Sequence, residues 1–217
     1  MITCAILTAF LVGTTPTVDS SGLDEPTVRI GLALSGGAAL GFAHIGVLKV
    51  LEREHIPVCC IAGNSMGSLV GGAYAAGYSA AEIESIAVNA DFSVLFSSAM
   101  PFGARYLPER RQDQRYFIEL EHNNFVPALP SGIVPLQNVE FLLMDLLSGI
   151  EFNTGYNFDS LPIPYRTIAV DLRSGALITL KQGRLEQAIR ASIAIPGVFS
   201  PETIDTLILV DGGVQQF

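Results

Sequence analysis

VCCIAGNSMGSLVGGAYAAG, residues 58–77, places one serine between two glycines directly after a short apolar run. The run VCCIA is typical of a buried strand, and the small-residue segment after Ser65 is typical of a helix that Gly77 can end. A strand that leads through Gly-x-Ser-x-Gly into a helix is the setting of a nucleophile elbow, a tight turn that exposes a serine hydroxyl. The alternative is a glycine-rich turn whose serine only caps the helix.

The two glycines of this pattern, Gly63 and Gly67, have a steric role in the elbow interpretation. A side chain at either position would collide with the strand or helix that crosses there. The helix that begins after Ser65 also points its amide dipoles at the reacting centre. These features favour Ser65 as a nucleophile.

The order of strand, glycine loop and helix recurs on both sides of this stretch. Upstream, VRIGLAL runs into SGGAALG and HIGVLKVLEREH; downstream come YRTIAVDL, ALITL, RLEQAIRAS and LILV, which ends in DGG. Short apolar strands that alternate with helices predict an α/β fold with a mostly parallel central sheet and helices on both faces. Right-handed crossovers would then place the loops SGG, GNS and DGG along one edge of the sheet.

Two further helices are expected in the middle of the chain. Ser79 and Glu82 form a capping-box signature ahead of a helix that reaches about Asn89, and residues 137–149 have helical apolar spacing. Residues 91–136 between them are expected to be an irregular, solvated connection. A lid or lipid-facing loop is the alternative for that region.

The loop SGGAALG, residues 35–41, follows the first predicted strand. Such loops can bind phosphate, but neither Gly-x-Gly-x-x-Gly nor P-loop spacing is present, because position 38 is alanine and no lysine follows in register. The exposed amides of Gly36 and Gly37 can instead point at an oxyanion, which acyl transfer requires.

The composition limits the kind of partner. With 12 Lys and Arg against 21 Asp and Glu, the net charge is −9, so we expect no nucleic acid partner and a neutral or apolar substrate. Cys59 and Cys60 are neighbours in an apolar run, where a bridge between them would be strained, so we expect buried, unpaired thiols. There is no Cys/His spacing of a zinc site, and neither a metal nor another cofactor is predicted.

The first residues, MITCAILTAFLV, form an uncharged apolar run that is too short to span a bilayer. Together with the polar, proline-containing stretch that follows, this run predicts a signal peptide and linker over residues 1–28 and a folded domain over residues 29–217. We therefore expect export to the periplasm, the outer membrane or the medium. No Lys or Arg precedes the run and no clear cleavage site follows it, so a mis-set or truncated start, with a cytoplasmic protein, is the alternative.

A serine nucleophile needs a group that takes its proton, and the three histidines of the chain are poorly placed for this. His44 lies early in a predicted helix, where we expect it to donate to the backbone; His55 lies at a helix end and His122 in the irregular region. A Ser-Asp-His order would put the histidine late in the chain. Asp211 ends a buried strand before two glycines, so its carboxylate can emerge where Ser65 is expected, although an ordinary turn aspartate is the alternative.

Four blocks of the sequence, taken in order, resemble the patatin-like phospholipase family. LALSGGAALGFAHIGVLKVLE resembles the family's oxyanion block, GNSMGS its nucleophile motif, ASIAIPGVFSP its Ala-Ser-x-Ala-x-Pro-Gly-x-Phe block and LVDGG its Asp-Gly-Gly/Ala motif. The resemblance extends over residues 29–214. It implies a three-layer patatin-like fold.

The resemblance also implies a lipid acyl hydrolase that uses a Ser-Asp dyad, here Ser65 and Asp211, with no histidine and no cofactor. The oxyanion hole corresponds to Gly36 and Gly37. An aspartate of ordinary pKa, about 3.9, is a weak base toward a serine hydroxyl, so partial desolvation and the loop amides must compensate. The implied substrate is a phospholipid or other acyl-ester lipid, which allows peripheral contact with a membrane.

This sequence departs from the family pattern at three places. Ala38 stands where a third glycine is common, Leu40 stands where a basic residue is common, and the chain ends at VQQF where the family continues with Asn, Pro and further structure. We therefore expect a fragment or a domain shortened at its C-terminus. A noncatalytic patatin-like lipid-binding or scaffold protein is the first alternative to a hydrolase. A Ser-His-Asp esterase is the second, and the missing late histidine argues against it.

Overall fold

The structure is a computed structural model, and it describes residues 29–95, 122–123, 126–127 and 136–215. The signal peptide and linker predicted at residues 1–28 lie outside the described residues, as does most of the predicted irregular connection. Within the described ranges, no helix has both the length and the apolar character needed to cross a membrane.

The secondary structure follows the predicted order closely. The helix predicted over residues 137–149 begins at Gln137 but continues to Thr154. The capping box is present, since the Ser79 hydroxyl accepts from the Glu82 amide and the Glu82 carboxylate accepts from the Ser79 amide.

The strands are β1 (Ile30–Leu34), β2 (Val58–Asn64), β3 (His122–Asn123), β4 (Val126–Pro127), β5 (Tyr165–Asp171), β6 (Leu177–Leu180), β7 (Glu202–Ile204) and β8 (Leu207–Asp211). The helices are α1 (Ala43–Arg53), α2 (Met66–Ala75), α3 (Ala80–Asn89), α4 (Phe92–Leu95), α6 (Gln137–Thr154) and α7 (Leu185–Ile193), with 3-10 turns η1 (Ala38–Phe42), η3 (Phe158–Ser160) and η4 (Gly212–Val214).

A six-stranded sheet organises the described residues, with strand order β1-β2-β5-β8-β7 and with β6 paired to β5. β1, β2 and β5 are parallel, whereas β6 and β8 are antiparallel to β5, and β7 is antiparallel to β8. Four of these six strands, β1, β2, β5 and β7, therefore run in one direction. The prediction of an α/β fold with a mostly parallel sheet is confirmed.

Strand β5 brings together the ends of two strands that are distant in sequence. β6 pairs with residues 167–170 along one edge of β5, while the other edge is shared by β2, at residues 165–168, and β8, at residues 169–171. Because β2 is parallel and β8 antiparallel to β5, their C-terminal ends meet beside Ile168 and Ala169. The loops SGG and GNS converge as predicted, but the DGG loop arrives from the opposite direction.

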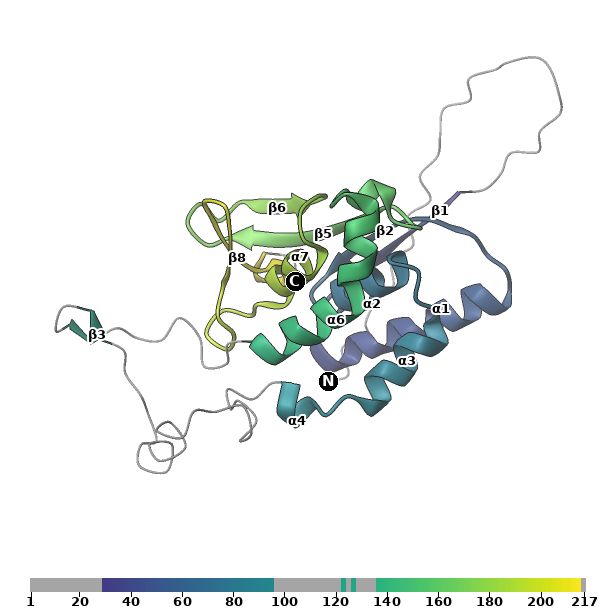
Figure 1. The fold of residues 1–217 in the computed structure, drawn as a ribbon, viewed down its shortest axis with the longest axis horizontal. Coiled ribbons are helices and arrows are strands. Elements are labelled where there is room, and N and C mark those ends of the chain that lie inside the picture. Colours follow the sequence, from purple (N-terminus) through teal and green to yellow (C-terminus); the bar gives the residue numbers. More distant parts are fainter. Residues whose placement is uncertain (1–28, 96–121, 124–125, 128–135, 216–217) are drawn as a thin grey trace, which may run out of the picture.

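Helical residues lie on both faces of the sheet, although unequally. α2 packs on β2 and β5, α7 packs on β5 and β8, and Figure 1 shows α1, α3 and α4 on the side of α2 away from the sheet. Both crossovers that join β1, β2 and β5 move in the same direction across the sheet, so right-handed connections put their helices on one face. On the opposite face, η4 begins at Gly212, where an added Cβ would lie 3.1 Å from the Ile168 side chain.

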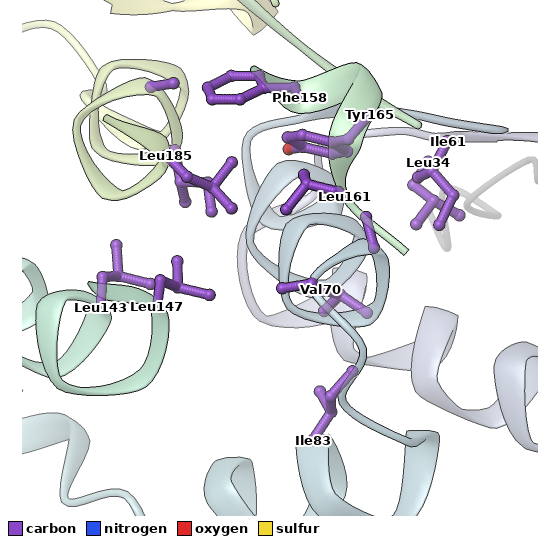
Figure 2. Packing of buried hydrophobic residues seen from close by; sticks show 14 of the residues in the cluster. Leu34, Ile61, Val70, Ile83, Leu143, Leu147, Phe158, Leu161, Tyr165 and Leu185 are labelled. Atoms are coloured by element: carbon purple, nitrogen blue, oxygen red, sulfur yellow. The ribbon is translucent and has the colours of Figure 1, made fainter. Parts of the chain in front are cut away.

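The small residues of α2 let this helix pack deeply between the sheet and α7. A Cβ added at Gly71 would lie 2.9 Å from Ile61 of β2, and one added at Gly72 would lie 2.6 Å from Ile189 of α7. Val70 is fully buried in the main core, which Figure 2 shows from close by. The small-residue segment after Ser65 is thus a packing requirement as well as a helix.

The two neighbouring cysteines differ from the prediction. Both are free, as expected, but Cys59 is only half-buried and Cys60 is exposed. Successive strand residues point to opposite faces, and Cys60 lies on the face of β2 that points away from α2. The prediction that both thiols are buried was therefore wrong; Cys60 is exposed because the α-helices described here cover only one face of β2.

Candidate active site

Ser65 occupies a strained turn between β2 and α2. Its φ is 52° and its ψ is −124°, a backbone conformation that costs a non-glycine residue on the order of 1–3 kcal/mol. A Cβ at Gly63 would lie 2.6 Å from the Gly67 carbonyl oxygen, and one at Gly67 would lie 2.6 Å from the Ser35 carbonyl oxygen. Neither glycine leaves room for a side chain, which is the geometry expected of a nucleophile elbow.

The Ser65 hydroxyl and the Asp211 carboxylate are in direct contact. Ser65 Oγ donates a hydrogen bond to Asp211 Oδ2 at 2.6 Å, and the two residues are 146 positions apart in the sequence. The contact exists because β2 and β8 end side by side on β5. Both residues are more than nine-tenths buried, and the Gly213 amide donates to Asp211 Oδ1 at 2.8 Å, which fixes the carboxylate plane.

The surroundings of Asp211 change its acid strength. Burial raises the pKa of the Asp211 carboxyl above its ordinary value, while the hydrogen bonds from Ser65 and from the Gly213 amide offset part of that rise. Desolvation disfavours the charged form, so the carboxylate is a stronger base here than in water. A stronger base is what removal of a serine proton needs.

Ser192, near the end of α7, holds the turn from the other side, and the sequence analysis gave it no role. Its hydroxyl accepts a hydrogen bond from the Ser65 amide at 2.9 Å and donates one to the Ile168 carbonyl at 2.6 Å. Two residues further on, the Ala194 carbonyl accepts from the Asp211 amide at 2.9 Å. This short segment therefore positions both candidate catalytic residues, and the only sequence signal for it is the Ala-Ser-x-Ala block.

The loop between β1 and η1 runs beside the candidate nucleophile. A Cβ added at Gly36 would lie 3.0 Å from Ser65 Cβ, so only a glycine allows the loop to come this close. Within the described part of the chain, the Gly36 and Gly37 amides donate no hydrogen bond, so both remain available to an oxyanion. Ala38 adopts a left-handed φ of 47°, and the Leu40 side chain is 64% exposed.

The histidines lie away from this chemistry. His44 is buried and donates from Nε2 to the Ser35 carbonyl at 2.9 Å, the backbone contact that its sequence position predicted. His55 is exposed after the end of α1, and His122 belongs to the short strand β3. Among the hydrogen bonds of the described residues, none joins a histidine to Ser65. The same residues contain no group of three or more His, Cys, Asp and Glu that could hold a metal ion.

Comparison with known proteins matches this chain to one family. The patatin-like phospholipase family model matches residues 32–217. An uncharacterized NTE family protein of Mycobacterium tuberculosis is 33% identical over 186 residues, which cover 86% of this chain and 43% of that protein. Human patatin-like phospholipase domain-containing protein 6 is 27% identical over 193 residues, which cover 85% of this chain and 12% of the human protein.

The solved structures agree at the level of the fold. VipD from Legionella pneumophila has a TM-score of 0.53 at 15% identity, over 85% of this chain and 46% of that chain. This chain spans less than half the length of the relatives it matches. Since the family model covers residues 32–217, which include the main sheet from Leu32 onward and the whole candidate site, the chain belongs to the patatin-like phospholipase family.

Proposed function

We propose that this chain is a serine lipid acyl hydrolase, of phospholipase A or lysophospholipase type, that cleaves carboxylic esters with a Ser65–Asp211 dyad. One observation carries the proposal: in a strained and buried turn, the Ser65 hydroxyl donates to the Asp211 carboxylate at 2.6 Å. Membership of the patatin-like phospholipase family supports lipid ester hydrolysis in general terms.

In the first half of the reaction, Ser65 Oγ attacks the ester carbonyl carbon and its proton passes to Asp211 Oδ2. The carbonyl π electrons move onto oxygen, and the amides of Gly36 and Gly37, together with the N-terminus of α2, stabilise the resulting oxyanion. When the tetrahedral intermediate collapses, the C–O bond to the leaving group breaks. The leaving alcohol or lysolipid takes the proton from Asp211, and an acyl group remains on Ser65.

In the second half, a water molecule takes the place of the leaving group. Asp211 removes a proton from this water while its oxygen attacks the acyl carbon, and the same amides stabilise the second oxyanion. Collapse returns the proton to Ser65 Oγ and releases a fatty acid. The same carboxylate is therefore the base in both halves, so its raised pKa favours proton removal in both.

Covalent labelling with a fluorophosphonate, followed by mapping of the labelled residue, tests this function. We expect the label on Ser65 alone, and we expect Ser65→Ala to abolish both labelling and hydrolysis of a short p-nitrophenyl ester with an unchanged circular dichroism spectrum. Ser35 and Ser68 are neighbouring serines that serve as internal controls. A label on either of them with Ser65 unmodified would contradict the assignment. A folded wild-type chain that is neither labelled nor active would indicate the noncatalytic lipid-binding alternative.

A further inference from the structure

The end of α7 supports both members of the candidate dyad. The Ser192 hydroxyl accepts a hydrogen bond from the Ser65 amide at 2.9 Å. Two residues later, the Ala194 carbonyl accepts one from the Asp211 amide, also at 2.9 Å. The nucleophile and its base come from different strands, so their relative position depends on where the end of α7 lies on the sheet.

A buried arginine anchors this end of α7, which packs against both α6 and β8 (Figure 1). Arg190 is 7% exposed, and its guanidinium forms an ion pair with the carboxylate of Glu202 in β7, which is 8% exposed. Arg190 Nε also lies 3.5 Å from a carboxylate oxygen of Glu140 on α6. A buried ion pair adds little net stability, because both charges lose their hydration, but each charge then needs its partner in place. The pair therefore holds α7 at one position on β7.

The strand that carries Glu202 leads directly to the candidate base. In the antiparallel pair of β7 and β8, Glu202 lies opposite Leu209, which comes two residues before Asp211. Leu209 also shares a small buried cluster with Ala191 of α7. The ion pair thus ties the helix that holds the elbow to the two strands that hold the base.

We propose that Arg190 is a positioning residue, whose ion pair with Glu202 sets the distance between Ser65 and Asp211. The inference rests on the function proposed above. The dyad hydrogen bond of 2.6 Å joins the ends of two strands that meet only along β5. If α7 shifted on β7, the elbow and the base would move apart, and a displacement of about 1 Å can cost about 100-fold in rate.

The two carboxylates beside Arg190 provide a test with a matched control. Glu202→Gln removes the charge on β7 but leaves Arg190 with Glu140, so we expect a folded protein. Its kcat for p-nitrophenyl butyrate should fall about tenfold with KM within about twofold, because only the dyad geometry changes. Glu140→Gln removes the charge on α6, which carries no residue of the candidate site, and should change kcat less than about twofold. Equal losses of kcat in the two variants would reduce Arg190 to a structural role.

Amide hydrogen exchange reports the position of α7 without any turnover. In Glu202→Gln the Ser65 and Asp211 amides should exchange at least about tenfold faster, because both bond to the end of α7. The Ile61 amide of β2 bonds to the segment before β5 instead, and its exchange should change less than about twofold. Ile83→Ala, in the buried core on α3, is the control for general destabilisation and should not single out the two dyad amides.

These measurements separate the inference from the proposed function. If wild type neither hydrolyses the ester nor reacts with a fluorophosphonate while the exchange pattern holds, the proposed function fails and the geometric assignment stands. If wild type is active but a folded Glu202→Gln protein shows unchanged exchange at Ser65 and Asp211, the positioning role fails and the function stands.

A second pair of variants keeps the test decisive if Glu202→Gln does not fold. Arg190→Lys keeps the positive charge but loses the planar guanidinium, whereas Arg190→Met loses the charge as well. We expect kcat to fall about threefold in Arg190→Lys and at least about tenfold in Arg190→Met, with exchange of the Ser65 and Asp211 amides in the same order. If position 190 served packing alone, methionine would be tolerated at least as well as lysine, and that order would overturn the proposal.

Discussion

The two glycine turns that follow β1 and β2 share the order of strand, turn and helix, yet they differ in what fixes them. In the β2 turn, backbone atoms fill the space beside Gly63 and Gly67. In the β1 turn, an added Cβ at Gly37 would meet nothing closer than 3.7 Å, and Ala38 and Leu40 are exposed. Backbone packing fixes the turn that carries the candidate nucleophile, whereas the turn that carries the candidate oxyanion hole packs on side-chain atoms, with Gly36 against Ser65 and Gly41 against Met66, and leaves position 37 open.

The largest effect is expected from removing the base beside the β2 turn. Asp211→Asn keeps the size of the side chain and an acceptor for the Gly213 amide but cannot take the serine proton. We expect kcat for a p-nitrophenyl ester to fall about 100-fold to 10,000-fold. His44→Gln, His55→Gln and His122→Gln, made one at a time, should each leave measurable turnover.

Circular dichroism provides the control for these variants, because His44 holds the Ser35 carbonyl and its loss can loosen the β1 turn indirectly. The decisive contrary result is a folded histidine variant as inactive as Ser65→Ala, together with an active Asp211→Asn. That pair of results would show that a histidine is the general base, and it would place the protein among the histidine-dependent esterases.

The steric difference between the β2 turn and an exposed position in α1 predicts opposite stability changes for the same glycine-to-alanine substitution. Gly67→Ala puts a Cβ into the backbone at the end of β1, so we expect a loss of about 3 kcal/mol or more in the free energy of unfolding. Gly46 is exposed in α1, where an added Cβ has no atom within 4 Å, and Gly46→Ala should raise the same quantity by about 0.5–1 kcal/mol. Urea denaturation measures both, and a loss below about 1 kcal/mol in Gly67→Ala would refute the close backbone packing of the β2 turn.

The burial of Asp211 predicts how activity and stability depend on pH. Only the ionised carboxylate accepts the proton, so kcat/KM should fall about tenfold per pH unit on the acid side, with a midpoint above the ordinary 3.8. The raised pKa means that this group's contribution to folding is fully present below pH 3.8 and is lost as pH rises through its folded pKa. Asp211→Asn should therefore melt above wild type at neutral pH and lose that advantage in acid. A midpoint at or below 3.8 would refute the desolvated base.

Ser192 sharpens the comparison because its hydroxyl bonds to the β2 turn and to β5 but not to the β1 turn. Ser192→Ala removes one hydrogen bond to the Ser65 amide and one to the Ile168 carbonyl, so we expect about 1–3 kcal/mol less stability. The fluorophosphonate labelling rate of Ser65 should fall about tenfold, because the turn loses its support. Ser68→Ala is the matched control, since the buried Ser68 hydroxyl bonds to Tyr165 and Thr167 but not to Ser65. Similar labelling rates in the two variants would make Ser192 merely structural.

The sequence predicts most of the β2 turn, because its constraints are local. Gly-x-Ser-x-Gly between an apolar run and a small-residue helix is sufficient to place Ser65 in a strained turn, and the contacts of Gly63 and Gly67 agree. The contact with Asp211 could not be obtained in this way. A parallel sheet would have placed DGG beside GNS at one edge, whereas β8 in fact runs antiparallel and meets the end of β2 along β5.

The sequence does not indicate residues whose role depends on tertiary contacts. Ser192 forms its bonds to Ser65 and Ile168 across long sequence separations, so no local pattern indicates them. The exposure of Cys60 depends on which face of β2 the helices cover, and an apolar run does not distinguish one covered face from two.

The smallest effect is expected in the β1 turn, at the alanine that replaces a glycine common in the family. Ala38 adopts a φ of 47°, a conformation that costs an alanine on the order of 1–2 kcal/mol and a glycine almost nothing. Ala38→Gly relieves that cost but gives the unfolded chain more freedom, which offsets about 0.4–1 kcal/mol of the gain. We expect a net stabilisation below about 1 kcal/mol, and a change in kcat below about threefold, because the amides of Gly36 and Gly37 do not depend on the side chain at position 38. Urea denaturation and ester turnover measure the two quantities. A loss of stability would mean that the Ala38 side chain makes a needed contact. A rise in kcat of tenfold or more would mean that alanine at this position distorts the oxyanion hole. In that case the β1 turn would require glycine as strictly as the β2 turn does.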